Sequence, residues 1–261
     1  MPRERVVILH GQELHFYEKG KGSTVILLHG MVGASTDWAY VFGPLSTKYR
    51  VIALDQIGFG RSARPKIEYR ISTFVEYLRD FMRSQHISRA AIVGNSLGGW
   101  IAMDFAAQHP ELVSCLVLVD PAGLDTPVHH AVPVNMNPSS REDVRNLWRT
   151  LFYDNKLATD YLVDYEWRRL QRFSDRETIR SVTSALVSGT EYEDQKIGSI
   201  QAPTLLIWGR NDALLPLSYG ELVHKAIGGS TLTVLDECGH VPQLEKPREF
   251  VQALLKFLDR H

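Results

Sequence analysis

One short stretch constrains the fold of this chain more than any other. Residues 90–93 are apolar and run directly into the sequence G-N-S-L-G at positions 94–98, which an apolar, glycine-tolerant helical pattern follows. Such a turn between a strand and a helix holds its serine in strained geometry, so the residues two before and two after must be small. Gly94 and Gly98 meet this requirement. The stretch therefore predicts a strand, a sharp turn that presents Ser96, and a helix.

The other apolar runs alternate with helical patterns along most of the chain. Glycine at position 11 allows a tight turn between two strands, which predicts an antiparallel hairpin at the edge of a sheet. The order of strands and helices predicts an α/β fold with a mostly parallel, doubly wound sheet. The predicted hairpin strands are residues 6–10 and 14–17, and the predicted buried strands are residues 24–28, 49–54, 90–93, 115–119, 204–208 and 231–235.

A long insertion interrupts this alternation after the strand at 115–119. It has no continuous apolar strand, but its aromatic residues recur at helical spacing, which predicts a helical cap. The expected organisation is a core in two parts, residues 1–123 and 196–261, with the cap at 124–195. Within the cap, Ser140 and Ser174 each have an acidic residue three positions later, a pattern typical of helix N-caps.

Composition and charge narrow the classes of molecule that this chain is expected to bind. The 29 basic and 30 acidic residues form no run of five or six like charges, which argues against a nucleic-acid or anionic membrane surface. The apolar run at 6–9 is too short for a signal peptide or a membrane span, so we expect a cytoplasmic protein without membrane insertion. Cys115, Cys238 and the pair His129-His130 lack metal-ligand spacing. We expect reduced thiols, no metal, no cofactor and a small-molecule substrate; a homodimer is left open.

The residues that follow the predicted strands supply a nucleophile, a base and an acid. Side chains at the carboxyl ends of parallel strands meet at one edge of the sheet. A serine nucleophile needs a base to take its proton and a carboxylate to orient that base. Ser96, Asp212 and His240 occur in the order expected for this topology. Asp120 also ends a strand and is an alternative for the orienting acid. The backbone N–H groups of Met31 and Leu97 are the expected oxyanion donors.

Together these motifs resemble the α/β-hydrolase fold superfamily. The resemblance rests on strand-H-G, D-x-x-G-x-G-x-S, G-N-S-L-G-G-W, G-x-x-D and C-G-H, which occur in this order over most of the chain, and the insertion after Asp120 lies where this superfamily carries a helical cap. Within this superfamily, the chain is similar both to serine esterases and to the hydrolases of ring meta-cleavage products. Dehalogenases and epoxide hydrolases of the same fold place an aspartate where this chain has Ser96.

The resemblance leaves the reaction open between two hydrolase classes. Asn95, Gly98-Gly99, the C-G-H motif and the cap arginines Arg168 and Arg169 resemble the carbon–carbon bond hydrolases. Those enzymes usually have a tryptophan where this chain has Val241, and a longer glycine-rich oxyanion loop. On this balance we predict first a serine carboxylesterase that forms an acyl-enzyme on Ser96, second a carbon–carbon bond hydrolase, and as a different class a ligand receptor with little turnover.

Seven residues are candidate substrate contacts, and four of them have a plainer structural role as an alternative. For His29 the alternative is packing within its loop, and for the cap aromatics it is packing in the core. For the cap arginines it is a charge on the solvent-exposed face of a helix. The candidates are His29, Gly30, Asn95, Trp148, Tyr165, Arg168 and Val241.

Overall fold

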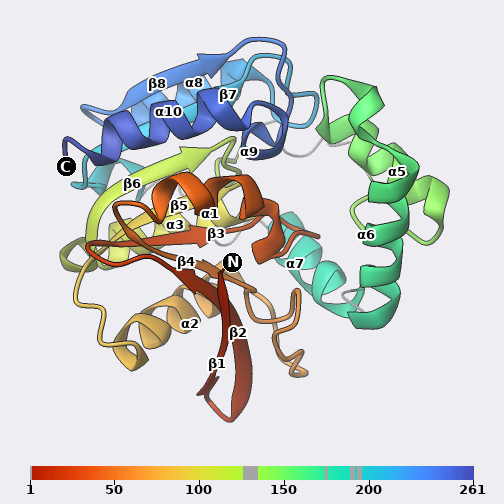
Figure 1. Ribbon diagram of the computed structural model, residues 1–261, viewed down its shortest axis with the longest axis horizontal. Helices are drawn as coiled ribbons and strands as arrows, with labels where there is room; N and C mark the ends of the chain where they lie inside the picture. Colours follow the sequence, from red (N-terminus) through yellow and green to blue (C-terminus); the bar gives the residue numbers. More distant parts are fainter. Residues whose placement is uncertain (1, 126–134, 174–175, 189–191, 193–195) are drawn as a thin grey trace.

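The computed structural model describes residues 2–125, 135–173, 176–188, 192 and 196–261. Its described residues form one eight-stranded sheet in the order β1-β2-β4-β3-β5-β6-β7-β8, with helices on both faces (Figure 1). The strands are β1 (Arg3–Leu9), β2 (Gln12–Lys19), β3 (Thr24–Leu28), β4 (Arg50–Leu54), β5 (Ala90–Asn95), β6 (Val113–Val119), β7 (Thr204–Gly209) and β8 (Thr231–Leu235).

The helices follow the strands in alternation. The α-helices are α1 (Ala39–Leu45), α2 (Ile71–Ser84), α3 (Leu97–Gln108), α5 (Arg141–Leu151), α6 (Asp160–Phe173), α7 (Arg176–Ser188), α8 (Leu217–Ala226), α9 (Pro242–Glu245) and α10 (Pro247–Leu258). The short 3-10 helices are η1 (Ser35–Trp38), η2 (Pro110–Leu112), η3 (Asn155–Leu157) and η4 (Ile197–Ser199).

The sheet is parallel except at one edge. β1 pairs antiparallel with β2, and β2 pairs antiparallel with β4, whereas the strands from β4 through β8 in the sheet order are parallel. His10 and Gly11 both have positive φ, 51° and 73°, as the tight turn of a two-residue hairpin requires. The α/β fold, its mostly parallel sheet and the edge hairpin are thus as predicted.

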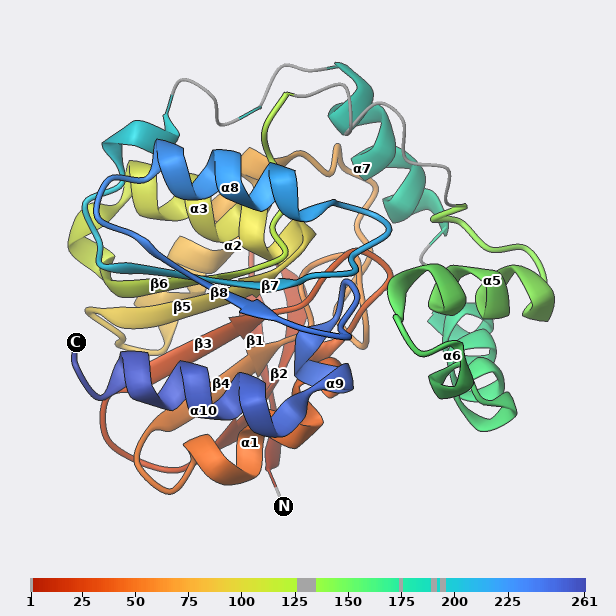
Figure 2. The same ribbon diagram turned by 90° about the horizontal axis from the view of Figure 1, so that it is seen from above.

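Each central strand packs against helices on both faces of the sheet. Figure 2 shows α2, α3 and α8 on one face and α1 and α10 on the other. Along β3, Ile26 and Leu28 belong to the core under α2 and α3, whereas Val25 and Leu27 belong to the core under α1 and α10. Successive side chains of a strand point to opposite faces, so a strand buried on both faces is apolar throughout.

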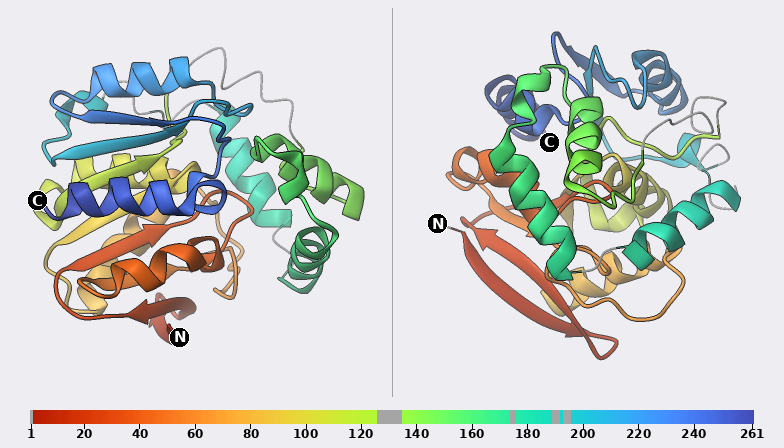
Figure 3. Two further views of the ribbon diagram at one scale, coloured as in Figure 1. Left: turned by 45° about the horizontal axis from the view of Figure 1, so that its top comes forward. Right: turned by 90° about the vertical axis from the view of Figure 1, so that its right-hand side faces the viewer.

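The insertion between β6 and β7 contains α5, α6 and α7, which lie beside the carboxyl ends of the central strands (Figures 1 and 3). At the start of α5, the Ser140 hydroxyl accepts the Asp143 N–H and the Asp143 carboxylate accepts the Ser140 N–H, each at 3.0 Å. This confirms one predicted cap, whereas Ser174 lies outside the described residues. The helical insertion is observed, and its limits at 124 and 195 stay a prediction.

Two features outside the site bear on the expected chemistry. No described helix has both the length and the apolar character needed to cross a membrane. Cys115 and Cys238 are free, buried thiols, and burial raises the pKa of Cys115 to about 11. A thiol with so high a pKa carries little thiolate at neutral pH, so Cys115 is unreactive.

Candidate active site

Ser96 occupies the turn between β5 and α3. Its φ of 54° and ψ of −116° lie far from the helical region, and such strain is common at functional sites. Its N–H donates to the Val119 carbonyl at 3.0 Å, while its own carbonyl accepts the N–H groups of Trp100 and Ala122. The backbone of this turn is thus held from β6 and from the helix. The hydroxyl makes no hydrogen bond to another described residue and is available for chemistry.

The two predicted glycines are required by backbone contacts. A β-carbon at position 94 would lie 2.1 Å from the Gly98 carbonyl oxygen, and one at position 98 would lie 2.3 Å from the Leu28 carbonyl oxygen. Rigid backbone surrounds both positions, so no side chain can move aside.

We expect Gly94→Ala to destabilise the protein by about 3 kcal/mol, as overpacking at a rigid site does, and to lower the activity of the fraction that stays folded. Thermal unfolding followed by circular dichroism measures the first effect. Gly228→Ala is the matched control, because a β-carbon there has no atom within 4 Å. Equal unfolding temperatures for the two variants would contradict the packing argument.

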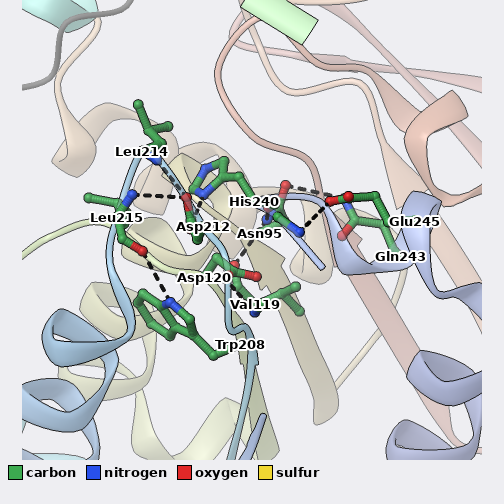
Figure 4. A network of polar contacts seen from close by, with 12 residues as sticks. Asn95, Val119, Asp120, Trp208, Asp212, Leu214, Leu215, His240, Gln243 and Glu245 are labelled. Atoms are coloured by element: carbon green, nitrogen blue, oxygen red, sulfur yellow. Dashed lines mark hydrogen bonds and ion pairs between the residues drawn. The ribbon is translucent and has the colours of Figure 1, made fainter. Parts of the chain in front are cut away.

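His240 and Asp212 form a buried pair in the loops after β8 and β7. His240 Nδ1 lies 2.6 Å from Asp212 Oδ2, and Asp212 Oδ1 accepts the N–H groups of Leu214 and Leu215 at 2.8 and 2.9 Å (Figure 4). His240 Nε2 has no hydrogen-bond partner among the described residues. Asp212 therefore orients the imidazole, and Nε2 is the nitrogen that can take a proton from Ser96.

Asp120 lies beside this pair without being its acid. Its Oδ1 accepts the Gly209 N–H at 3.0 Å, and its Oδ2 is buried without a hydrogen-bond partner among the described residues. Burial, and then the negative charge of Asp212, raise the pKa of Asp120 well above its ordinary value, which favours the neutral acid. These contacts favour Asp212 over Asp120 as the acid that orients His240.

Asp120, Asp212 and His240 also have one ligand atom each within 4.8 Å of the others, a spacing that a metal ion could use. Asp212 Oδ1 already accepts two N–H groups and its Oδ2 faces His240 Nδ1. Both Asp212 oxygens and His240 Nδ1 are therefore already engaged, so the set fits an oriented base better than a metal site.

Asn95 joins the nucleophile turn to the histidine loop. Its amide nitrogen donates to the carbonyls of Val119 at 3.0 Å and His240 at 3.1 Å, and its side-chain oxygen accepts the Gln243 amide at 3.2 Å (Figure 4). Both amide hydrogens are therefore used within the protein. Asn95 lines the cavity, but its polar groups hold the base loop against the nucleophile turn, and its substrate contact stays a prediction.

The cavity beside Ser96 is small and mostly apolar. Its volume is about 30 Å³, close to the space of one water molecule. The predicted contacts Gly30, Trp148 and Val241 line it, as does Met31. The N–H groups of Met31 and Leu97 donate to no other described residue, as oxyanion donors require. The site residues predicted from the sequence did not include six further lining residues, namely Val32, Gly33, Asp37, Met136, Leu147 and Leu151.

Three predicted contacts lie elsewhere. His29 is fully buried, with Nδ1 against the Gly30 carbonyl at 2.7 Å and Nε2 accepting the Gln56 N–H at 3.1 Å, so its prediction as a substrate contact is wrong. Tyr165 and Arg168 line a separate cleft of about 470 Å³ that does not include Ser96. Their substrate contact stays a prediction, because neither residue lines the cavity beside Ser96.

The sequence did not identify a charged cluster beside the cavity, formed by Asp37, Glu166 and Arg169. Burial, and then the negative charge of Glu166, raise the pKa of Asp37 to about 7. Glu166 and Arg169 form a buried ion pair with Nη2 and Oε2 2.7 Å apart. Their spacing of three residues in a helical pattern was a signal that they could pair, but it could not show which surface α6 would cover. The pair His129-His130 lies outside the described residues.

The comparisons with known proteins agree with the observed fold. A family model described as alpha/beta hydrolase fold matches residues 23–247. A curated 2-hydroxy-6-oxo-6-(2'-aminophenyl)hexa-2,4-dienoic acid hydrolase from Metapseudomonas resinovorans is 32% identical, over 98% of this chain and 91% of the relative.

Two solved structures are similar over nearly the whole chain. A meta-cleavage product hydrolase from Pseudomonas fluorescens has a TM-score of 0.87 and 30% identity, covering 98% of this chain and 97% of that chain. A membrane phospholipase A, described as a bacterial virulence factor, has a TM-score of 0.91 and 29% identity, covering 99% of this chain and 86% of that chain.

Proposed function

This chain belongs to the alpha/beta hydrolase fold family, and we propose that it is a serine hydrolase that cleaves a carbon–carbon bond in acidic products of aromatic ring cleavage. The similarity to a dienoic acid hydrolase over 98% of the chain carries this proposal. The structurally similar meta-cleavage product hydrolase supports it. The sequence placed ester hydrolysis first, and the relatives favour the second alternative.

The site supplies the groups that this reaction needs. Ser96 Oγ attacks the ketone carbon while His240 Nε2 takes the hydroxyl proton, and Asp212 stabilises the imidazolium. The N–H groups of Met31 and Leu97 stabilise the oxyanion. When the oxyanion collapses, the carbon–carbon bond breaks, and the departing dienoate carbon takes up a proton from the imidazolium. Water, activated by His240, then releases the acyl group from Ser96 as a carboxylic acid.

Ester hydrolysis is the second candidate, and the composition of the cavity favours it. Apart from His240, no residue that the structure places around the Ser96 cavity can carry positive charge, whereas an acidic dienoate has a carboxylate to bind. Val241 stands where the carbon–carbon hydrolases usually have a tryptophan. The similarity to a phospholipase A is consistent with an ester substrate.

Parallel assays separate the two reactions. We expect the purified protein to cleave a 2-hydroxy-6-oxo-6-phenylhexa-2,4-dienoate with kcat/KM at least about tenfold above that for p-nitrophenyl butyrate, a preference of about 1.4 kcal/mol. Loss of the dienoate absorbance and release of p-nitrophenol measure the two rates. Turnover of p-nitrophenyl esters alone would reject the first proposal and support the second.

Arg168→Ala tests how a substrate carboxylate is recognised. Because Arg168 lines the separate cleft, the described structure leads us to expect kcat/KM for the dienoate to stay within about twofold of wild type, as for surface changes generally. The prediction from the sequence requires the opposite result, a loss of tenfold or more for the dienoate with the ester unaffected. That result would show that α6 rotates or shifts when the substrate binds.

A further inference from the structure

Arg169 connects the cap to the loop that carries Met31. It lies on α6, and its guanidinium donates to the backbone carbonyls of Val32 and Gly33, the latter at 3.4 Å. These residues are 136 and 137 positions away in the sequence, so the contact is purely tertiary. A cap helix thus reaches the two residues that directly follow the expected oxyanion donor.

The guanidinium is held in place by Glu166. Nε and Nη2 of Arg169 lie 3.1 and 2.7 Å from Glu166 Oε2, and the two side chains are only 7% and 5% exposed. Removing one partner of such a pair leaves an uncompensated buried charge. Glu166 therefore fixes the direction in which Arg169 presents its remaining N–H groups.

The loop beneath Arg169 adopts a conformation that it would not favour alone. Val32 has a φ of 63°, and a β-branched residue rarely adopts this left-handed region. The turn closes through a hydrogen bond from the Gly33 N–H to the Gly30 carbonyl at 3.1 Å. Strain of this kind persists only where surrounding contacts hold it. Arg169 supplies such a contact, since it binds the carbonyl of the strained residue.

The cap also contacts the opposite side of the site. The His240 N–H donates to the Leu151 carbonyl at 2.8 Å, and the Glu245 carboxylate accepts the N–H groups of Tyr153 at 2.7 Å and Gly239 at 2.9 Å. The end of α5 therefore holds the histidine loop, while α6 holds the oxyanion loop. A seated cap fixes both halves of the site.

We propose that Arg169 is a positioning residue through which the seated cap sets the oxyanion loop, so that the Met31 N–H is aimed correctly only when α6 is in place. This inference rests on the proposed serine hydrolase function, whichever bond is cleaved. Arg169 acts on the rate of attack by Ser96 rather than on the affinity for the substrate.

The test uses a fluorophosphonate probe, because its reaction does not depend on the natural substrate. Ser96 Oγ forms a bond to phosphorus, fluoride leaves, and the hydroxyl proton passes to His240 Nε2. We expect Arg169→Met to slow labelling about 100-fold, the size of effect seen when one oxyanion donor is lost. The matched control is Arg141→Met, an exposed cap arginine paired with Asp164, which should label within twofold of wild type.

A second variant separates positioning from folding. Glu166→Gln combined with Arg169→Met removes both charges, so its unfolding temperature should return toward that of wild type while labelling stays slow. On any substrate that the enzyme turns over, kcat should fall with KM within about twofold.

Three results would overturn the inference: labelling of Arg169→Met within threefold of wild type, recovery of the labelling rate in the double variant, or an effect on KM alone. Labelling of wild type without cleavage of the dienoate would reject only the proposed substrate. A wild-type protein that the probe does not label would reject both.

Discussion

Replacing Ser96 with alanine is expected to lower turnover of every substrate about a million-fold, because the residue that forms the covalent intermediate is lost while the rest of the site stays in place. The Ser96 hydroxyl makes no hydrogen bond to another described residue, so the folded state should lose little stability. Initial rates with the dienoate and with p-nitrophenyl esters measure the effect, and circular dichroism checks the fold.

Two results would contradict this prediction in different ways. Residual activity above about one per cent of wild type would mean that another group is the nucleophile, since a lone catalytic serine contributes far more than 100-fold. A wild-type protein that binds a ligand in the Ser96 cavity but shows no serine-dependent turnover would instead be a receptor. The pairing of His240 with Asp212 argues against that alternative, because a receptor needs no oriented base.

Local patterns were sufficient to predict the core of the fold. The continuous apolar runs correspond to strands buried on both faces, and this pattern depends only on which layers cover the sheet. Gly94 and Gly98 identified the nucleophile turn because their backbone contacts tolerate no β-carbon. In each case the physical requirement falls on residues that are close together in the sequence.

The choice between Asp120 and Asp212 required the structure. Each follows one of two neighbouring parallel strands, β6 and β7, so both reach the same edge of the sheet. Only the loop geometry separates them, because the Leu214 and Leu215 N–H groups turn one carboxylate toward His240. Side-chain direction in a loop is set by such tertiary contacts and has no periodic pattern in the sequence.

Residues that act through long-range contacts were the hardest to assign. Arg168 and Arg169 are adjacent on α6 and both line the outer cleft, yet the guanidinium of Arg169 also contacts the oxyanion loop. Helical periodicity distinguishes two faces but does not say which face meets the core when the helix belongs to an inserted cap. His29 follows the same logic, since its Nε2 accepts the N–H of Gln56, 27 positions away, which only the fold brings near.

Asp212→Asn should lower kcat about 10⁴-fold, whereas Asp120→Asn should change it by less than about threefold. An amide at position 212 cannot stabilise the imidazolium, and it favours the wrong tautomer of His240. An asparagine at position 120 keeps an oxygen that can accept the Gly209 N–H, and it stays neutral, like the acid it replaces. Rates measured across the pH range with the same substrate compare the variants. Inactivation by Asp120→Asn alone would reverse the assignment.

The comparison of Asp120→Asn with wild type also allows a second, independent measurement, which is the dependence of stability on pH. Burial raises the pKa of Asp120 in the folded protein, so above about pH 4 the folded chain holds a proton that the unfolded chain has released. The contribution of Asp120 to the free energy of unfolding therefore falls as pH rises through this window. Asparagine has no such proton, so the unfolding temperature of Asp120→Asn relative to wild type should increase between about pH 4 and pH 7. A constant difference across this range would show that Asp120 is ionised in the folded protein, where two buried carboxylates would then repel each other beside His240.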